Sequence, residues 1–343
     1  MFADDIAGRH CKEMASGKFP IYSTFAAIDR AGFRVDDLAT LRAEMKELVE
    51  TLISQEIGAI SQVSETIDYV VSLGMPGSQQ ALAALRSSVR QSLPSRQDVR
   101  IILANFRLWL DEAKPAIRAA FLEVLPQLSP SVGDLGTKGM QELLQGANSL
   151  PEDGSRCLLE LVGRYGSTDA RVILGVSTFA HRAITLGRNE YLAELENVAP
   201  PTKVRRVKAA SDMIDAVGTL TEICLERGEI LWFRIMDLIF ALSRKSFESA
   251  SFAAANLPKR VQQFSADGAV LYVQAFHSLV QAMGIRVTGY GLNELPKIFA
   301  KYGNERAVSF VNSASLAADT YGVTAGQCFL ERKTVASKNA LSS

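Results

Sequence analysis

The chain is poor in the side chains that most often carry out chemistry. Among its 343 residues there are only three histidines, His10, His181 and His277. None has a second histidine or a cysteine three or four positions further on, and no H-E-x-x-H occurs. Zinc sites built on one helix need such pairs. The sequence therefore predicts no metal site of this kind and few proton shuttles.

Cysteines are also few, and they lie far apart. Four single cysteines do not form a C-x-x-C pair or the even spacing of a disulfide-stapled secreted domain. We expect them to be small apolar side chains in a reducing, cytoplasmic compartment. They are Cys11, Cys157, Cys224 and Cys328.

The chain lacks net charge and long apolar runs. Lys plus Arg equals Asp plus Glu at 37 each, so no global field attracts nucleic acid or acidic lipid. The most apolar stretch, 230–242, contains Arg234 and Asp237 and is shorter than the roughly twenty residues that a membrane-spanning helix needs. We predict a buried helix there and no membrane span. The acidic start, "MFADDIAGRHCKEM", predicts no secretory signal.

Motifs for phosphate, cofactor or nucleophile are missing as well. "GDLGTKG" at 133–139 does not have the spacing of G-x-x-x-x-G-K-[ST], and "GVSTF" at 175–179 lacks the second glycine of a nucleophile elbow. "TGYGLNEL" at 288–295 has no third glycine. We expect no cofactor and no enzymatic activity.

Apolar residues at helical spacing fill most of the chain, which predicts an all-α fold. One long helix, or two in line, is predicted over 35–73, where two copies of the chain could pair. Further helices are predicted over 80–92, 96–111 and 115–128, with a cap in "LPSRQD" and Pro115 in a first turn.

A short phrase recurs in the second half of the chain. In "YGNERAVSFV" at 302–311 and in "YGVTAGQCFL" at 321–330, Tyr-Gly is followed, seven positions after the glycine, by Phe and an aliphatic residue. We interpret Gly166, Gly228, Gly303 and Gly322 as left-handed residues at helix ends, with the preceding large residue covering the turn. Such spacing predicts antiparallel helix hairpins stacked as an α-solenoid or helical-repeat array. The alternative is coincidence, which leaves the fold helical.

Glycine, proline and serine mark the predicted domain limits. "SPSVGDLGTKG" at 129–139 lacks an apolar stripe and indicates a boundary. We predict an N-terminal helical bundle over 1–130, a helical-repeat domain over 131–334 and a flexible tail over 335–343. A weaker boundary is predicted at 199–210.

Two features could contact a partner. Lys203, Arg205, Arg206 and Lys208 form a basic cluster that could hold a phosphate backbone or an acidic protein surface, or could be a solvated helix start. Trp232 is expected in the core, or alternatively as an exposed anchor in a helical groove.

The segment 291–341 resembles a known family. Leu-Pro near a helix start, Tyr-Gly at turns and "FLERKT" near the end are similar to the helical repeats before the von Willebrand A domain of NorD-like and CbbO-like proteins. This resemblance implies a role beside a MoxR-type AAA+ ATPase. A von Willebrand A domain itself is not expected, because "DGSRC" at 153–157 departs from its D-x-S-x-S metal motif.

Together these features predict a non-enzymatic helical-repeat scaffold that binds a protein partner. One alternative is a helical enzyme or small-molecule-binding protein, in which His181 or His277 meets a carboxylate in a pocket. Another is nucleic-acid binding through residues 203–208.

Overall fold

The computed structural model describes residues 76–197 and 204–339, and before them residues 44, 45, 47, 48, 50–52, 65, 66, 69, 70 and 72–74. The side chains of 204–207, 224, 225 and 332–339 lie outside this description. All regular structure in the described residues is helical, which confirms the all-α class. Most of the helix predicted over 35–73 lies outside the described residues, and so does the pairing of two copies expected there.

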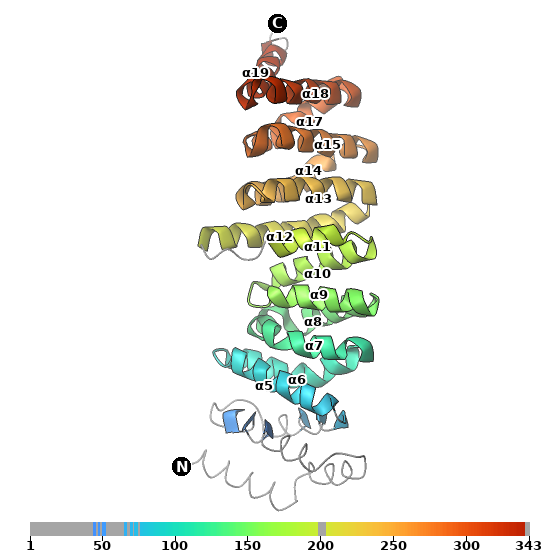
Figure 1. Cartoon of the computed structure of the whole chain (residues 1–343), viewed down its shortest axis with the longest axis vertical. Helices are drawn as coiled ribbons and strands as arrows, with labels where there is room; N and C mark the ends of the chain where they lie inside the picture. Colours follow the sequence, from blue (N-terminus) through green and yellow to red (C-terminus); the bar gives the residue numbers. More distant parts are fainter. Residues whose placement is uncertain are drawn as a thin grey trace, which may run out of the picture. The chain divides into compact units, whose positions relative to one another are not determined.

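Two compact units divide the chain, residues 1–177 and residues 178–343. In unit 1, α5 packs against α6 and α7, α7 packs against α9, and α6 packs against α8 (Figure 1). The largest side chains between them, Phe106, Trp109 and Phe121, are fully buried. The helices are α5 (Gly77–Ser92), α6 (Arg96–Glu112), α7 (Pro115–Leu128), η1 (Ser129–Ser131), α8 (Val132–Asn148), α9 (Glu152–Arg164) and the first half of α10 (Ala170–Thr185).

The sequence signals at the starts of α6 and α7 act as predicted. Ser95 is the N-cap of α6, and its side chain accepts a hydrogen bond from the Asp98 backbone N–H at 3.2 Å. This bond satisfies one of the donors that the first turn leaves open. Pro115 begins α7, where its missing N–H removes no helical bond.

The segment 129–139, where a domain boundary is predicted, is largely helical. It forms η1 and the first turns of α8. Val132 and Leu135 are buried, and the Ser131 hydroxyl donates to the Gly166 carbonyl at 2.8 Å or to the Thr168 carbonyl at 2.7 Å. Gly136, with a non-helical φ of 62° and ψ of 179°, forms a kink that interrupts α8 after its first turn.

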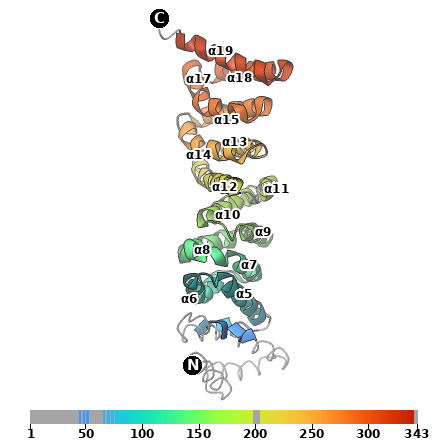
Figure 2. The same cartoon turned by 90° about the vertical axis from the view of Figure 1, so that its left-hand side faces the viewer.

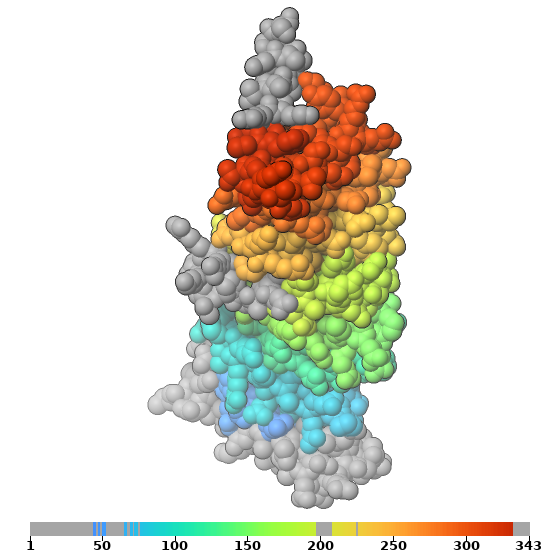
Figure 3. All heavy atoms as spheres, turned by 45° about the horizontal axis from the view of Figure 1, so that its top comes forward, coloured from blue at the N-terminus to red at the C-terminus, as the bar shows by residue number. Residues whose placement is uncertain are grey.

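Unit 2 consists of the second half of α10 and the helices that follow it. In it, α12 packs against α14, α13 against α15, and α15 against α18, so that α13, α15 and α18 lie side by side in chain order (Figures 1 and 2). The atoms of the last helices face the viewer in Figure 3, coloured red. The helices are α11 (Asn189–Asn197), α12 (Val204–Leu225), α13 (Glu229–Ser243), α14 (Phe247–Val261), α15 (Ala266–Met283), η2 (Gly284–Val287), α16 (Thr288–Asn293), α17 (Leu295–Tyr302), α18 (Asn304–Tyr321) and α19 (Val323–Asn339).

Aromatic side chains form much of the core of unit 2. Trp232 on α13 contacts Phe179 and Tyr191, with ring centroids 5.8 and 5.5 Å away. A second group joins Tyr272 on α15 to Phe299 on α17 at 5.9 Å. The predicted buried helix over 230–242 is confirmed as α13, because most of its apolar side chains lie in this core.

One apolar stretch has the length and composition that crossing a membrane requires. Among the described residues it is Ala266–Asn293, with a mean hydropathy of 1.2 and half of its most apolar window buried inside the protein. A core helix of a soluble protein passes the same test. The predicted absence of a membrane span, which was argued for the stretch 230–242, stays a prediction.

Three of the four predicted turn glycines have positive φ. Gly228, Gly303 and Gly322 have φ of 106°, 78° and 90°. Their ψ values, 151° to 165°, are extended rather than left-handed helical, so the expected left-handed end is wrong in detail. Gly303 and Gly322 are single residues between successive helices. This region of φ and ψ is accessible almost only to glycine.

Gly166 does not have the predicted conformation, since its φ is not positive. Glycine is needed there for a different reason: a Cβ atom would lie 2.2 Å from the Gln127 backbone oxygen. The idea that a tyrosine covers each turn is also wrong for Tyr302 and Tyr321, which are 43% and 80% exposed.

Candidate functional site

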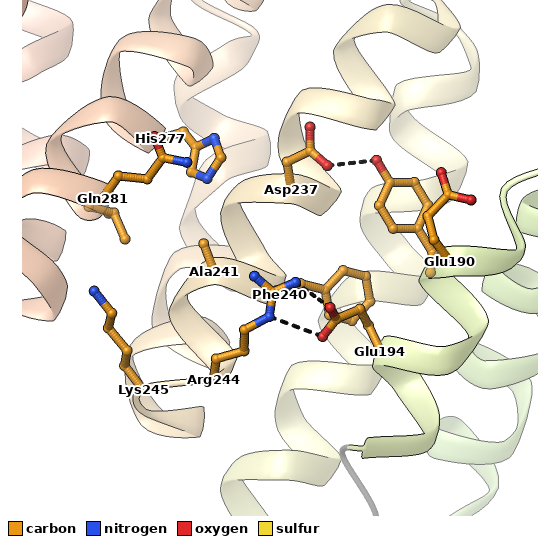
Figure 4. A pocket seen from close by; sticks show the side chains of 11 residues that line it. Glu190, Glu194, Asp237, Phe240, Ala241, Arg244, Lys245, His277 and Gln281 are labelled. Carbon is orange, nitrogen blue, oxygen red and sulfur yellow. Dashed lines mark hydrogen bonds and ion pairs between the residues drawn. The ribbon is translucent and has the colours of Figure 1, made fainter.

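A groove of about 470 Å³ opens on the surface of unit 2. Three helices supply its side chains: α11 with Glu190 and Glu194 on one side, α15 with His277 and Gln281 on the other, and α13 between them (Figure 4). The remaining lining residues are Tyr191, Asp237, Phe240, Ala241, Arg244, Lys245 and Val280. The helical period of 3.6 explains the pattern, because residues four and seven positions apart on α13 point to the same side.

Buried aromatic rings form the base of the groove. Tyr191 stacks on Phe240 with ring centroids 5.8 Å apart, and both side chains are less than a tenth exposed. The Tyr191 hydroxyl donates to the Asp237 carboxylate at 2.8 Å. Burial raises the pKa of Tyr191, and the hydrogen bond to Asp237 adds to the rise. The phenol therefore stays protonated and keeps this carboxylate oriented.

An ion pair connects α11 to the end of α13. The Arg244 guanidinium donates to both oxygens of Glu194, and the Nε–Oε2 distance is 3.2 Å. This contact raises the pKa of Arg244. Glu190 also has a partner, Arg188, at 3.4 Å. All three carboxylates of the groove thus have a polar partner within the protein.

Three donor side chains of the groove have no such partner. In the described part of the chain, Lys245, His277 and Gln281 form no side-chain hydrogen bond or ion pair. The Lys245 ammonium lies beside Gly284, where α15 ends, 3.8 Å from the position that a Cβ atom would occupy. The partial negative charge of a helix C-terminus favours a cation there.

His277 is half-buried at the rim of the groove. Burial lowers the pKa of His277 below its usual value near 6.5; Asp237 opposes this effect, whereas Arg234 and Arg244 add to it. The imidazole is therefore neutral at neutral pH. A neutral ring beside a carboxylate can donate one hydrogen bond and accept another.

The second histidine of unit 2 lies outside this groove. His181 on α10 is not among the lining residues, and burial lowers its pKa as well. Among the described residues, no group of three or more His, Cys, Asp or Glu side chains could hold a metal ion.

The predicted basic cluster is only partly described. Lys203 lies outside the described residues, and the backbones of Arg205 and Arg206 belong to the first turn of α12 without a description of their side chains. Lys208 is exposed on the same helix. Nucleic-acid binding through this cluster stays a prediction.

Trp232 lies in the core, which is the first of its two predicted positions; the other was an exposed anchor in a helical groove. It is 1% exposed, and its indole N–H donates to the Thr221 hydroxyl at 3.1 Å. A side chain buried in this way cannot act as an exposed anchor for a partner.

Among the groove residues, only His277 is a candidate site residue on the basis of the sequence. A weak signal was available at α13, where Asp237 lies in a largely apolar helix and Arg244 directly follows the last helical residue. The other lining residues are spread along the chain from Glu190 to Gln281, so no short motif in the sequence indicates that they lie together.

Comparisons with known proteins add no family to these observations. No family model, curated protein or solved structure matches the chain.

Proposed function

We propose that the chain is a non-enzymatic helical-repeat scaffold that binds a partner protein through the face of unit 2 formed by α11, α13 and α15. The observation that carries this proposal is the groove, which is open to solvent, extends over three helices and exposes three donors that have no partner in the described part of the chain. Repeat proteins bind partners on such surfaces, which successive helices build together.

The packing order within each unit supports the repeat interpretation. Helices contact those two positions further along the chain: α5 with α7, α7 with α9, α12 with α14, and α13 with α15. Stacked helix hairpins produce this pattern, since each hairpin buries its apolar face against the next one. The one-residue junctions at Gly303 and Gly322 fit tight hairpin ends.

The interior of the groove also favours recognition over catalysis. Asp237 and Glu194 are both held by internal contacts. A general base needs a free site within hydrogen-bond reach of its substrate. A role beside a MoxR-type AAA+ ATPase is part of this proposal through the resemblance of 291–341 alone, and the cytoplasmic setting is part of it through the scattered cysteines.

Affinity capture with matched variants tests the proposal. A variant with Lys245→Glu and Gln281→Glu places two extra acids in the groove, whereas Lys259→Glu changes an exposed lysine of α14 outside it. We expect a stoichiometric partner to be retained by the native chain and by Lys259→Glu, and to be lost from the groove variant. Equal retention by all three would exclude the groove as the binding surface.

A small-molecule or enzymatic role is the second candidate, and one observation favours it. His277, whose pKa burial lowers, lies in the same groove as Asp237, and perturbed groups in a pocket are typical of functional sites. This candidate predicts that a metabolite mixture raises the melting temperature of the native chain and leaves that of His277→Asn unchanged. Equal shifts would contradict it.

A further inference from the structure

The polar side chains of the groove differ in whether they have a partner within the protein. Its carboxylates are occupied by Tyr191, Arg188 and Arg244, whereas Lys245, Gln281 and His277 have no partner among the described residues. The Lys245 side chain can only donate, and the Gln281 amide and the His277 ring can each donate as well as accept. An acceptor oxygen of an occupant is the one group that all three can bind.

The surrounding acids limit the charge of that occupant. Glu190, Glu194 and Asp237 line the same groove and would repel a dianionic phosphate more strongly than a single carboxylate. A carboxylate also offers two coplanar oxygens, which can accept from an ammonium and from an amide at once. One negative charge on a planar group fits best.

We propose that Lys245, Gln281 and His277 bind the carboxylate of an acidic side chain in a partner polypeptide. This inference rests on the proposed function and names the chemistry of the partner. Charge complementarity selects a polypeptide segment with an isolated Asp or Glu over a strongly acidic run, because each further acid would meet the carboxylates of α11. The aromatic rings of Tyr191 and Phe240 lie below and give the segment an apolar base.

Nuclear magnetic resonance of the full chain with two capped pentapeptides tests this inference. One peptide has a single central glutamate among alanines, and the other has glutamine at that position. The readout is the imidazole signal of His277, assigned by its loss in His277→Asn. We expect the glutamate peptide to shift this signal and to bind about ten-fold more tightly than the glutamine peptide, as removal of a charged hydrogen-bond partner predicts.

Matched variants locate the carboxylate. Lys245→Gln removes the charge and retains much of the side-chain length, and we expect it to weaken binding of the glutamate peptide about ten-fold. Lys259→Gln on α14 should leave binding unchanged. Equal affinity for the two peptides, no shift with either, or normal binding by Lys245→Gln would overturn the inference. The peptide comparison itself uses the unmodified chain, so it does not depend on the folding of a variant.

A further arm identifies the source of the carboxylate. N-acetylglutamate should bind more weakly than the pentapeptide if flanking backbone contributes, and tighter binding of N-acetylglutamate would overturn the polypeptide source. Failure of the peptides while a captured partner still depends on the groove variant would refute this inference and leave the proposed function standing.

Discussion

At the scale of single residues, backbone conformation decides where glycine is required. Gly303 and Gly322 have open space around the position of a Cβ atom, so steric contact with neighbours does not demand glycine. The demand comes from φ near 80° to 90° with extended ψ, where any L side chain is strained. Gly166 is the opposite case, with ordinary φ and a backbone oxygen in the way.

Replacement of these junction glycines should therefore destabilise unit 2. We expect Gly303→Ala and Gly322→Ala each to lower the free energy of unfolding by about 1–3 kcal/mol, the cost of a strained backbone residue. Urea denaturation measures the change. Gly289→Ala is the control, because Gly289 has no positive φ and an open Cβ position; it should be neutral or mildly stabilising. Equal effects at all three positions would contradict the conformational explanation.

His277 makes stability depend on pH. Its pKa is about 6.5 in the unfolded chain and lower in the folded one, because it is half-buried near Arg234 and Arg244, against the opposing charge of Asp237. Between these two values the unfolded state binds more protons, so the free energy of unfolding falls as the pH drops below about 6.5 and levels off below the folded pKa.

Unfolding curves of the native chain and of His277→Asn from about pH 8 to about pH 5 test this linkage. The native chain should lose more stability over the acidic part of the range than the variant does. Lys259→Gln should follow the native curve. Identical pH dependence in the native chain and in His277→Asn would show that this imidazole is not desolvated.

At the scale of helices, local signals predicted the elements well. Capping at Ser95, proline at position 115 and the apolar run after Gly228 determine where α6, α7 and α13 begin, and each acts within one or two turns of chain. The helical structure within 129–139 does not follow from its local composition, because contacts with other segments support it: Val132 and Leu135 are buried, and the Ser131 hydroxyl bonds to the backbone of 166–168.

The groove could not be predicted in the same way, because its residues come from three helices. Tyr191 and Asp237 are 46 positions apart and still share a hydrogen bond. Periodicity indicates which side of a helix is apolar, but not which helix will lie beside it. The sequence indicates His277 only as a candidate that needs a carboxylate nearby, and it does not show which carboxylate that is.

The ion pair between α11 and α13 should contribute little to stability. Arg244 is 61% exposed at its side chain, and exposed pairs contribute roughly 0–1 kcal/mol. A double-mutant cycle of Arg244→Ala and Glu194→Ala measures this coupling by chemical denaturation. We expect a value below about 1 kcal/mol, with the charge-swapped pair close to the native chain. A larger coupling would mean that the groove is a structural element rather than an adaptable surface.

At the scale of the whole molecule, the central claim is that one helical face of unit 2 binds a partner. The neutral net charge of the chain argues against attraction of polyanions in general. Recognition would then depend on the local arrangement of donors in the groove. The opposite prediction, nucleic-acid binding through 203–208, requires an affinity that falls steeply with salt.

Site-specific photo-crosslinking tests the central claim most directly. A photoreactive residue at Ala241, which lines the groove and is not one of the proposed binding side chains, is compared with one at Asn256 on α14, outside it. We predict that position 241 crosslinks one partner protein in the native lysate and that an excess of the purified chain without the photoreactive residue competes this product away. Position 256 should not form it. A partner crosslinked equally from both positions, or only from position 256, would contradict the account.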